Sequence, residues 1–141
     1  MSVSAQQRQR LIRMARASAR HAYAPYSKFG VGAAILLSDG RFFSGCNVEN
    51  ASYGLTICAE RNAIFCAVAG SSRKPEIVAA AVVNDKGVPC SPCGACRQVL
   101  AEFGPRAVVW YPSPDGFTQR TMQELLIDGF TFNPDNSDAP S

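Results

Sequence analysis

Three cysteines and one glutamate have the types and spacing of a metal-assisted hydrolytic site. Cys58 and Glu60 stand in one short segment, and Cys93 and Cys96 stand three positions apart in a second segment. Two cysteines at that separation can bind one ion, and zinc prefers thiolate ligands. A closed structural zinc site would need a fourth thiol three residues after Cys58, and none stands there. The spacing therefore predicts a zinc ion with three thiolate ligands and one open position.

An open position on zinc holds a water molecule, and coordination lowers the pKa of that water to about 7. Glu60 is not needed as a ligand, so we expect its carboxylate to carry protons. Three thiolates leave a negative site, and Arg61, three residues after Cys58, can donate a hydrogen bond to thiolate sulfur. Glu60 lies about 200 degrees around a regular helix from Cys58. The two side chains can therefore share a pocket only from the first turn of a helix.

The other thiols and the single histidine carry weaker signals. Cys46 lies in a predicted strand and Cys66 on an apolar helix, where thiols pack as small hydrophobic groups. Cys90 precedes Cys93 by three residues, and the sequence leaves open whether it is a fourth ligand or a bystander thiol. His21 stands among Ala and Arg residues, so we expect it on a helix surface without a catalytic role.

Hydrophobic spacing and turn residues predict the elements that position these segments. A first helix carries Leu11, Ile12, Ala15, Ala19 and Ala22 on one face and ends before Pro25. Asp39 and Gly40 form a hairpin signal, and Ser91 and Pro92 read as the start of a later helix. Each cysteine segment begins a helix, where the helix dipole stabilises thiolates. Strands are predicted at 29–37, 41–48, 76–83 and 107–111, and later helices at 58–69, 91–103 and 121–126.

Length and composition favour one α/β domain with a core of its own. The chain has 141 residues, 47% of them hydrophobic, and a formal net charge of +3. We expect the domain to span 1–132, followed by a disordered tail at 133–141 that is rich in Pro, Asp and Ser. No apolar run approaches the roughly 18 residues of a membrane span, and no secretory signal is recognisable, so we expect a cytoplasmic protein.

Basic residues are concentrated at the start of the chain. This arrangement fits a transit peptide, a basic patch or the solvated face of an amphipathic helix, and we favour the helix. The net charge is too small to indicate a nucleic-acid partner. The arginines that precede the first acidic residue, Asp39, are Arg8, Arg10, Arg13, Arg16 and Arg20.

Longer motifs around these residues resemble the zinc nucleobase deaminases and, more narrowly, the small homotetrameric cytidine deaminases. Cys-Ala-Glu at 58–60 and Pro-Cys-x-x-Cys at 92–96 match the superfamily signature. The narrower family is matched by Pro-Tyr-Ser-Lys-Phe-x-Val-Gly-Ala-Ala at 25–34, Gly-Cys-Asn-Val-Glu-Asn-Ala-Ser-Tyr at 45–53 and Cys-Gly-Ala-Cys-Arg-Gln-Val at 93–99. The resemblance runs from about Ala24 to Phe130.

The resemblance implies a three-layer α/β fold, with a mixed five-stranded sheet and helices on both faces. It implies hydrolytic deamination of cytidine and 2'-deoxycytidine in pyrimidine salvage, with one zinc ion per subunit. Cys58, Cys93 and Cys96 match the zinc ligands, and Glu60 matches the proton shuttle. In that chemistry the activated water attacks C4, while Glu60 delivers a proton to N3 and later assists the departure of ammonia.

Substrate positions and a homotetramer with shared active sites are implied as well. Asn47 and Glu49 match the residues that hold the ribose, and Phe29 matches an aromatic residue that packs on the pyrimidine. Ala51 and Tyr53 match positions that reach a neighbouring subunit's site. The family usually has proline where this chain has Ile127, and losing proline loosens the chain before the late aromatic that closes an adjacent site. The matching residues are, in chain order, Phe29, Asn47, Glu49, Ala51, Tyr53, Ala59 and Phe130.

Two other functions fit part of the pattern. A deaminase could act on another aminopyrimidine, such as an aminoacyl-nucleoside antibiotic or a base in nucleic acid. The segment from Asn47 to Asn50 favours a free ribose, and the chain lacks a basic, aromatic-rich segment for a polynucleotide. A non-enzymatic zinc module would close a four-thiolate site with Cys90, and it would leave Glu60 without a role. The sequence therefore favours a small nucleoside substrate, with neither nucleic acid nor membrane as a partner.

Overall fold

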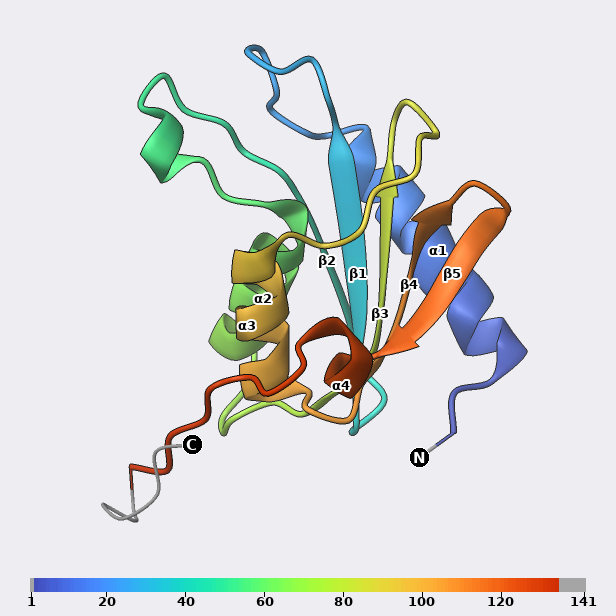
Figure 1. The fold of residues 1–141 in the computed structure, drawn as a ribbon, viewed down its shortest axis with the longest axis vertical. Coiled ribbons are helices and arrows are strands. Elements are labelled where there is room, and N and C mark those ends of the chain that lie inside the picture. Colours follow the sequence, from blue (N-terminus) through green and yellow to red (C-terminus); the bar gives the residue numbers. More distant parts are fainter. Residues whose placement is uncertain (1, 135–141) are drawn as a thin grey trace.

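A computed structural model describes residues 2–134, so most of the tail predicted at 133–141 lies outside the described residues. Its centre is one five-stranded sheet with the strand order β2-β1-β3-β4-β5 (Figure 1). β3 and β4 are parallel, and the other neighbouring strands are antiparallel. The predicted mixed five-stranded sheet is therefore confirmed. The strands are β1 (Val31–Leu37), β2 (Phe42–Cys46), β3 (Ile77–Asn84), β4 (Val108–Ser113) and β5 (Gly116–Thr121).

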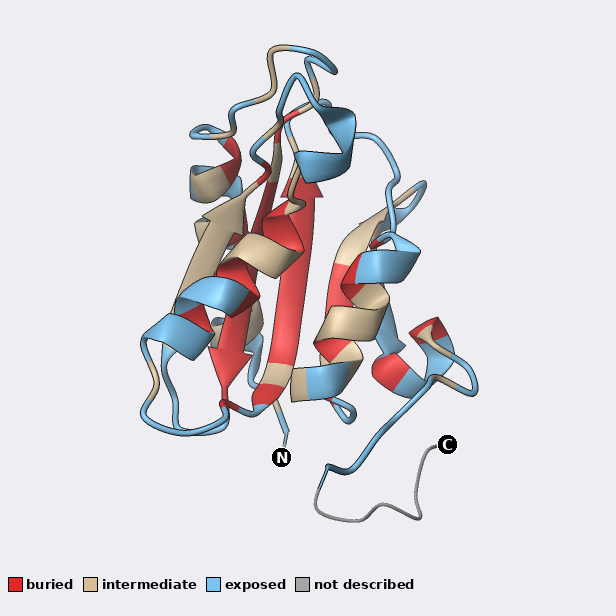
Figure 2. Ribbon diagram, turned by 90° about the vertical axis from the view of Figure 1, so that its left-hand side faces the viewer, coloured by how far each residue is buried: buried red, intermediate tan, exposed pale blue. Residues whose placement is uncertain are grey.

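Helices cover both faces of the sheet, as Figures 1 and 2 show. α1 (Ala5–Ala19) packs on one face, while α2 (Ala59–Ala69), α3 (Gly94–Phe103) and the short α4 (Met122–Leu125) pack on the other. Successive side chains of a strand point to opposite faces. Ile35 therefore joins the core under α2 and α3, and Leu36 joins the core under α1. This two-sided burial explains the nearly continuous apolar runs of β1 and β3.

Two glycines let helices lie directly on the hairpin strands. A Cβ atom on Gly32 would stand 1.9 Å from the Ala15 carbonyl oxygen of α1. A Cβ atom on Gly45 would stand 2.5 Å from the backbone nitrogen of Ala63 in α2. Side chains at these positions would push the helices outward. Gly45 thus allows α2, which begins beside Cys58, to pack closely against β2.

The structure differs from the elements predicted from the residues at three places. α1 ends at Ala19, so Ala22 lies beyond it. The helix predicted to begin at Ser91 begins at Gly94, with Cys93 as its N-cap residue. β5 was not predicted from the residues, because its Gly-Phe-Thr-Gln-Arg-Thr sequence has little apolar surface and forms an exposed edge. In the part of the chain from 2 to 134, no helix has both the length and the apolar character that a membrane crossing requires.

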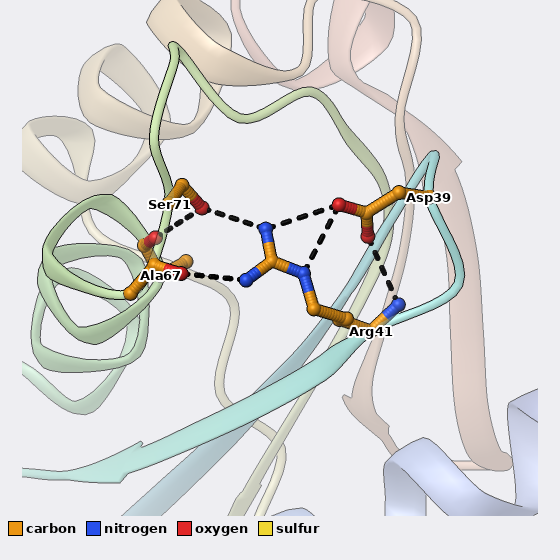
Figure 3. A network of polar contacts seen from close by, with 5 residues as sticks. Asp39, Arg41, Ala67 and Ser71 are labelled. Carbon is orange, nitrogen blue, oxygen red and sulfur yellow. Dashed lines mark hydrogen bonds and ion pairs between the residues drawn. The ribbon is translucent and has the colours of Figure 1, made fainter.

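Arg41 joins the β1–β2 hairpin to the C-terminal end of α2 (Figure 3). Its Nε and Nη2 atoms each lie 3.0 Å from a carboxylate oxygen of Asp39. Nη1 donates to the carbonyl oxygen of Gly70 at 2.6 Å, and Nη2 donates to Ser71 Oγ at 2.9 Å. The Ser71 hydroxyl in turn donates to the carbonyl oxygen of Ala67 at 2.6 Å. One guanidinium therefore fixes both the hairpin turn and the last turn of α2.

We expect Arg41→Met to lower the free energy of unfolding by about 1–2 kcal/mol, because several hydrogen bonds are lost while the aliphatic stem is kept. Arg106→Met is the matched control, since the Arg106 side chain is 80% exposed and forms an ion pair with Glu76 at the surface. The control should change stability by less than about 0.5 kcal/mol. Urea unfolding of both variants gives the comparison, and equal losses would contradict the role of the Arg41 network.

Candidate active site

Two helix N-termini bring the three cysteines together. Cys58 is the N-cap residue of α2, Cys93 is the N-cap residue of α3, and Cys96 lies in the first turn of α3. The two helices pack side by side on one face of the sheet. As a result the three sulfur atoms all lie within 4.8 Å of one another, and the Cys58 and Cys93 sulfurs are 3.9 Å apart. The predicted three-cysteine cluster is therefore present.

The cluster already favours one thiolate. Hydrogen bonds from Cys96 and Arg61 lower the pKa of Cys58 to about 5. The hydrogen bond to Cys58 and the burial of its own sulfur raise the pKa of Cys96. The Cys58 thiol therefore loses its proton readily. The Cys96 thiol holds its proton more tightly, in part because of the negative charge already present at Cys58. A divalent cation bound among the sulfurs supplies the positive charge that allows the other thiols to ionise.

Arg61, three residues after Cys58, contacts the cluster directly with its guanidinium. Its Nη2 atom donates to Cys58 Sγ at 3.3 Å, which is the contact that the spacing of three residues predicts. This contact raises the pKa of Arg61, so the guanidinium stays charged. A fixed positive charge beside sulfur offsets part of the negative charge of three thiolates.

Glu60 is buried in the first turn of α2, with 6% of its surface exposed. Burial raises the pKa of Glu60, and the negative charge at Cys58 raises it further. Ala59, which is fully buried, stands between the two residues. Cys58 precedes the first helical residue, so both side chains can face one pocket, as the sequence requires. A buried carboxyl group beside a cluster of potential metal ligands has the environment of a proton carrier.

The donor set fits zinc, and Cys90 does not belong to it. Sulfur-rich sites select zinc among the common divalent cations, and three ligands leave a position open. Cys90 is exposed and lies outside the group of sulfurs within 4.8 Å. Partial burial of its sulfur and, to a smaller extent, the nearby charges of Glu60 and Cys93 raise the pKa of Cys90, which favours the thiol form. Residues 2–134 therefore contain the three-thiolate site and not the closed four-thiolate module.

Asn47 is buried and holds the backbone that leads into β1. Its Oδ1 atom accepts from the Val31 nitrogen at 2.8 Å, and its Nδ2 atom donates to the Phe29 carbonyl oxygen at 2.8 Å. The side-chain amide thus clamps the chain on both sides of Gly30. This contact places the half-buried Phe29 relative to the sheet, a role that the sequence did not predict for Asn47.

Glu49 is held by the loop before β1 and faces a cavity. Its carboxylate accepts hydrogen bonds from the Tyr26 nitrogen at 2.9 Å, from the Ser27 nitrogen at 3.1 Å and from the Ser27 hydroxyl. These donors, the hydroxyl above all, lower the pKa of Glu49. Glu49 lines a cavity of about 380 Å³ together with Tyr26, Ser27, Tyr53 and Thr56. Tyr26 and Ser27 were not singled out from the sequence, although they belong to its Pro-Tyr-Ser motif.

Of the other predicted substrate residues, Ala59 is fully buried, whereas Ala51, Tyr53 and Phe130 are exposed. Ala51 lies in the loop after β2, and Tyr53, which is 75% exposed, begins a short 3-10 helix (Tyr53–Leu55) that precedes α2. Phe130 is 59% exposed and follows α4 in the chain. Ile127, at the position where a proline was expected from the resemblance, is 76% exposed. A single chain therefore brings the three cysteines and Glu60 together, but it leaves Ala51, Tyr53 and Phe130 exposed to solvent.

The sequence of this chain is similar to those of known proteins over most of its length. Residues 5–112 match the family model of the cytidine and deoxycytidylate deaminase zinc-binding region. A cytidine deaminase of Halalkalibacterium halodurans is 50% identical over 126 residues, which cover 88% of this chain and 94% of that protein. A cytidine deaminase of Sporosarcina psychrophila is 53% identical over 125 residues, which cover 87% and 90% of the two chains.

A solved structure shares the fold. The crystal structure of cytidine deaminase from Burkholderia pseudomallei matches with a TM-score of 0.79 at 48% identity, and the match covers 86% of this chain and 98% of that one. The family match includes all three clustered cysteines and Glu60, and the fold that brings them together is the same. The chain therefore belongs to the cytidine and deoxycytidylate deaminase family, and its three-cysteine cluster lies in the zinc-binding region of that family.

Proposed function

We propose that the protein catalyses the hydrolytic deamination of cytidine and 2'-deoxycytidine to uridine and 2'-deoxyuridine, with release of ammonia, in pyrimidine salvage. The observation that carries this proposal is the three-cysteine cluster with the buried carboxyl group of Glu60 beside it. The relatives that match most of the chain are named cytidine deaminases, which supports the substrate. One zinc ion per chain would be held by Cys58, Cys93 and Cys96.

Zinc bound by the three sulfurs supplies an activated water molecule at neutral pH. The chain's own residues then divide the remaining work. Glu60 takes a proton from the water and delivers it to ring N3, which makes C4 more electrophilic. The water oxygen forms a bond to C4, and a second proton passes from the resulting C4 hydroxyl through the same carboxylate to the amino group, so that ammonia departs as the C4–N bond breaks. Arg61 holds Cys58 and limits the negative charge at the site. Water and cytidine thus yield uridine and ammonia.

We expect Glu49 to accept a hydrogen bond from a ribose hydroxyl in the cavity beside Ser27. Its two carboxylate oxygens accept three bonds from the chain, which leaves lone-pair capacity for a substrate. Asn47 supports the same site through the backbone on either side of Gly30, and Phe29 is the aromatic side chain expected against the pyrimidine.

We expect Ser27→Ala to raise KM for cytidine about fivefold with little change in kcat, because one hydrogen bond that orients Glu49 is lost. Ser72→Ala, at an exposed position just after the C-terminal end of α2, is the control. The depressed pKa of Glu49 means that its contacts are complete above the usual value of 4.5 and are lost only as the pH falls further. In Ser27→Ala the rise of KM on acidification should therefore begin at a higher pH. Identical KM profiles for the two variants would contradict the role of Ser27.

We propose a homotetramer in which neighbouring subunits complete each active site with Ala51, Tyr53 and Phe130. Large apolar side chains are exposed both before α2 and after α4, and exposed apolar surface of this kind supports association. The free cysteines support a reducing, cytoplasmic location, and the two cores around one sheet support a single domain at 1–132. The exposed apolar side chains before α2 are Tyr53 and Leu55, and those after α4 are Ile127, Phe130 and Phe132.

Sedimentation analysis is expected to give four chains per particle for the native protein. Leu55→Asp and Ile127→Asp place a charge on the proposed contact surface, so each should shift the particle to a smaller species and lower the activity per chain. Val88→Asp, at another exposed apolar position, is the control. A native monomer with full activity would contradict the shared active sites.

The activity itself is tested by incubating the purified zinc protein with cytidine and 2'-deoxycytidine and measuring the ammonia and uridine formed in equal amounts. Cytosine in single-stranded DNA and an aminoacyl-nucleoside antibiotic serve as the rival substrates. We expect turnover of the two free nucleosides only. Preferential turnover of either rival, or zinc binding without any turnover, would overturn the proposed function.

A further inference from the structure

Two neighbouring side chains of α3, Arg97 and Gln98, join the metal-binding loop to the segment after α4. Arg97 Nε donates to the Pro92 carbonyl oxygen at 2.7 Å, and its Nη2 donates to Ser91 Oγ at 3.0 Å. The third nitrogen, Nη1, donates to the Leu125 carbonyl oxygen at 2.9 Å. The guanidinium therefore binds the loop directly before Cys93 and the end of α4, which lies about thirty positions further along the chain.

The chemistry of Arg97 suits a joint between two segments. A guanidinium is planar and presents five N–H donors in a rigid fork, so it can serve several acceptors in fixed directions at once. Arg97 is half-buried, and within residues 2–134 no acidic side chain forms an ion pair with it. All three of its acceptors are neutral oxygens of the two segments. Its charge thus strengthens bonds that position the backbone and loop.

Gln98 anchors the same C-terminal segment at a second point. Its Nε2 atom donates to the Phe130 carbonyl oxygen at 3.1 Å. Between the two anchors the chain passes through Asp128, whose φ of +54° lies in the left-handed region, and exposes Ile127. No proline stiffens this stretch. Consecutive residues of α3 therefore hold its two ends, at Leu125 and at Phe130.

We propose that Arg97 and Gln98 are positioning residues that fix the 125–130 segment, and with it Phe130, on the helix that also carries Cys96. The inference rests on the proposed function and deepens it. Arg97 binds both sides of the joint, whereas Gln98 binds the C-terminal side alone. Removing Arg97 therefore perturbs the metal-binding loop and the 125–130 segment together, and removing Gln98 perturbs only the segment.

The test uses the full-length zinc protein and two readouts that do not depend on turnover. The first is the rate at which zinc is lost to a chelator, followed with a metal-sensitive dye. The second is the rate of amide hydrogen exchange in peptides that cover 125–132. Arg97→Gln and Gln98→Ala are compared with Arg106→Gln, which removes an exposed guanidinium that binds neither segment. Arg97→Lys keeps the charge without the fork and replaces Arg97→Gln if that variant does not fold.

Arg97→Gln is expected to release zinc about tenfold faster, as is usual when a group that supports metal ligands is lost. It should also raise exchange in 125–132 about fivefold. Gln98→Ala should raise exchange alone, Arg97→Lys should show smaller changes of both kinds, and Arg106→Gln should show neither. Unchanged zinc release or unchanged exchange in both Arg97 variants would overturn the inference. Both readouts remain valid if the wild-type protein fails to deaminate cytidine, so the two failures are distinguishable.

Discussion

Glu60→Gln is expected to retain one zinc ion per chain and to lose at least about a thousandfold in kcat for cytidine. A glutamine has nearly the same shape but cannot accept a proton from water, and general acid–base groups contribute up to about 10⁴-fold to a rate. The carboxyl group does not belong to the three-sulfur cluster, so the metal should stay bound. Zinc content and single-turnover kinetics on the same preparation provide the measurement.

Glu102→Gln is the control for this substitution, because Glu102 lies on the exposed side of α3 and pairs with Lys74 at the surface. We expect it to keep nearly full activity. If Glu60→Gln retained a tenth or more of the wild-type kcat, the carboxylate could not be the proton carrier. If it lost zinc, the carboxylate would belong to the ligand set instead.

Cys58→Ser is expected to yield protein with far less than one zinc ion per chain and no measurable turnover. Cys90→Ser should keep both the metal and the activity. The two cysteines differ in position: Cys58 lies within 4.8 Å of the other two sulfurs, whereas Cys90 lies outside that group. Losing one of three thiolates removes a third of the ligand set, and metal binding contributes directly to folding stability. The melting temperature in zinc should therefore fall for Cys58→Ser alone.

Metal analysis after dialysis and thermal unfolding with and without a chelator distinguish the two variants. Cys66→Ser, at an exposed position of α2, controls for the general loss of a thiol. Release of zinc by Cys90→Ser with retention by Cys58→Ser would show that the ligand set has been misassigned. The four-thiolate alternative would then regain its support.

The spacing of charged, thiol and apolar residues was sufficient for the three-cysteine cluster and for four of the five strands, whereas the five-stranded sheet followed only from the family resemblance. Cys58 and Cys93 begin helices, and this local fact already directs both sulfurs toward helix N-termini. Helical geometry also requires Glu60 to lie in the first turn of a helix if it is to share a pocket with Cys58. α2 begins at Ala59, so Glu60 does lie in its first turn. The unbroken apolar runs of β1 and β3 predict burial on both faces, because only such strands need no polar side.

Boundaries were less predictable where local signals compete with packing. Ser91 and Pro92 form a good helix start in isolation, yet α3 begins at Gly94. In the structure Pro92 is buried and its carbonyl oxygen accepts from the Arg97 side chain, so burial and this bond hold the segment that precedes α3. β5 escaped detection because an exposed edge strand gains its order from pairing with β4.

By itself, the sequence determined that three thiols, one carboxyl group and one guanidinium stand at the starts of helices in an α/β chain. These features depend on residues a few positions apart, which local geometry governs. Only the tertiary structure decided that Cys90 lies outside the cluster, that Asn47 clamps the backbone around Gly30, and that Arg97 ties Ser91 and Pro92 to Leu125. Each of these depends on groups distant in sequence, whose hydrogen bonds exist only once the layers have packed.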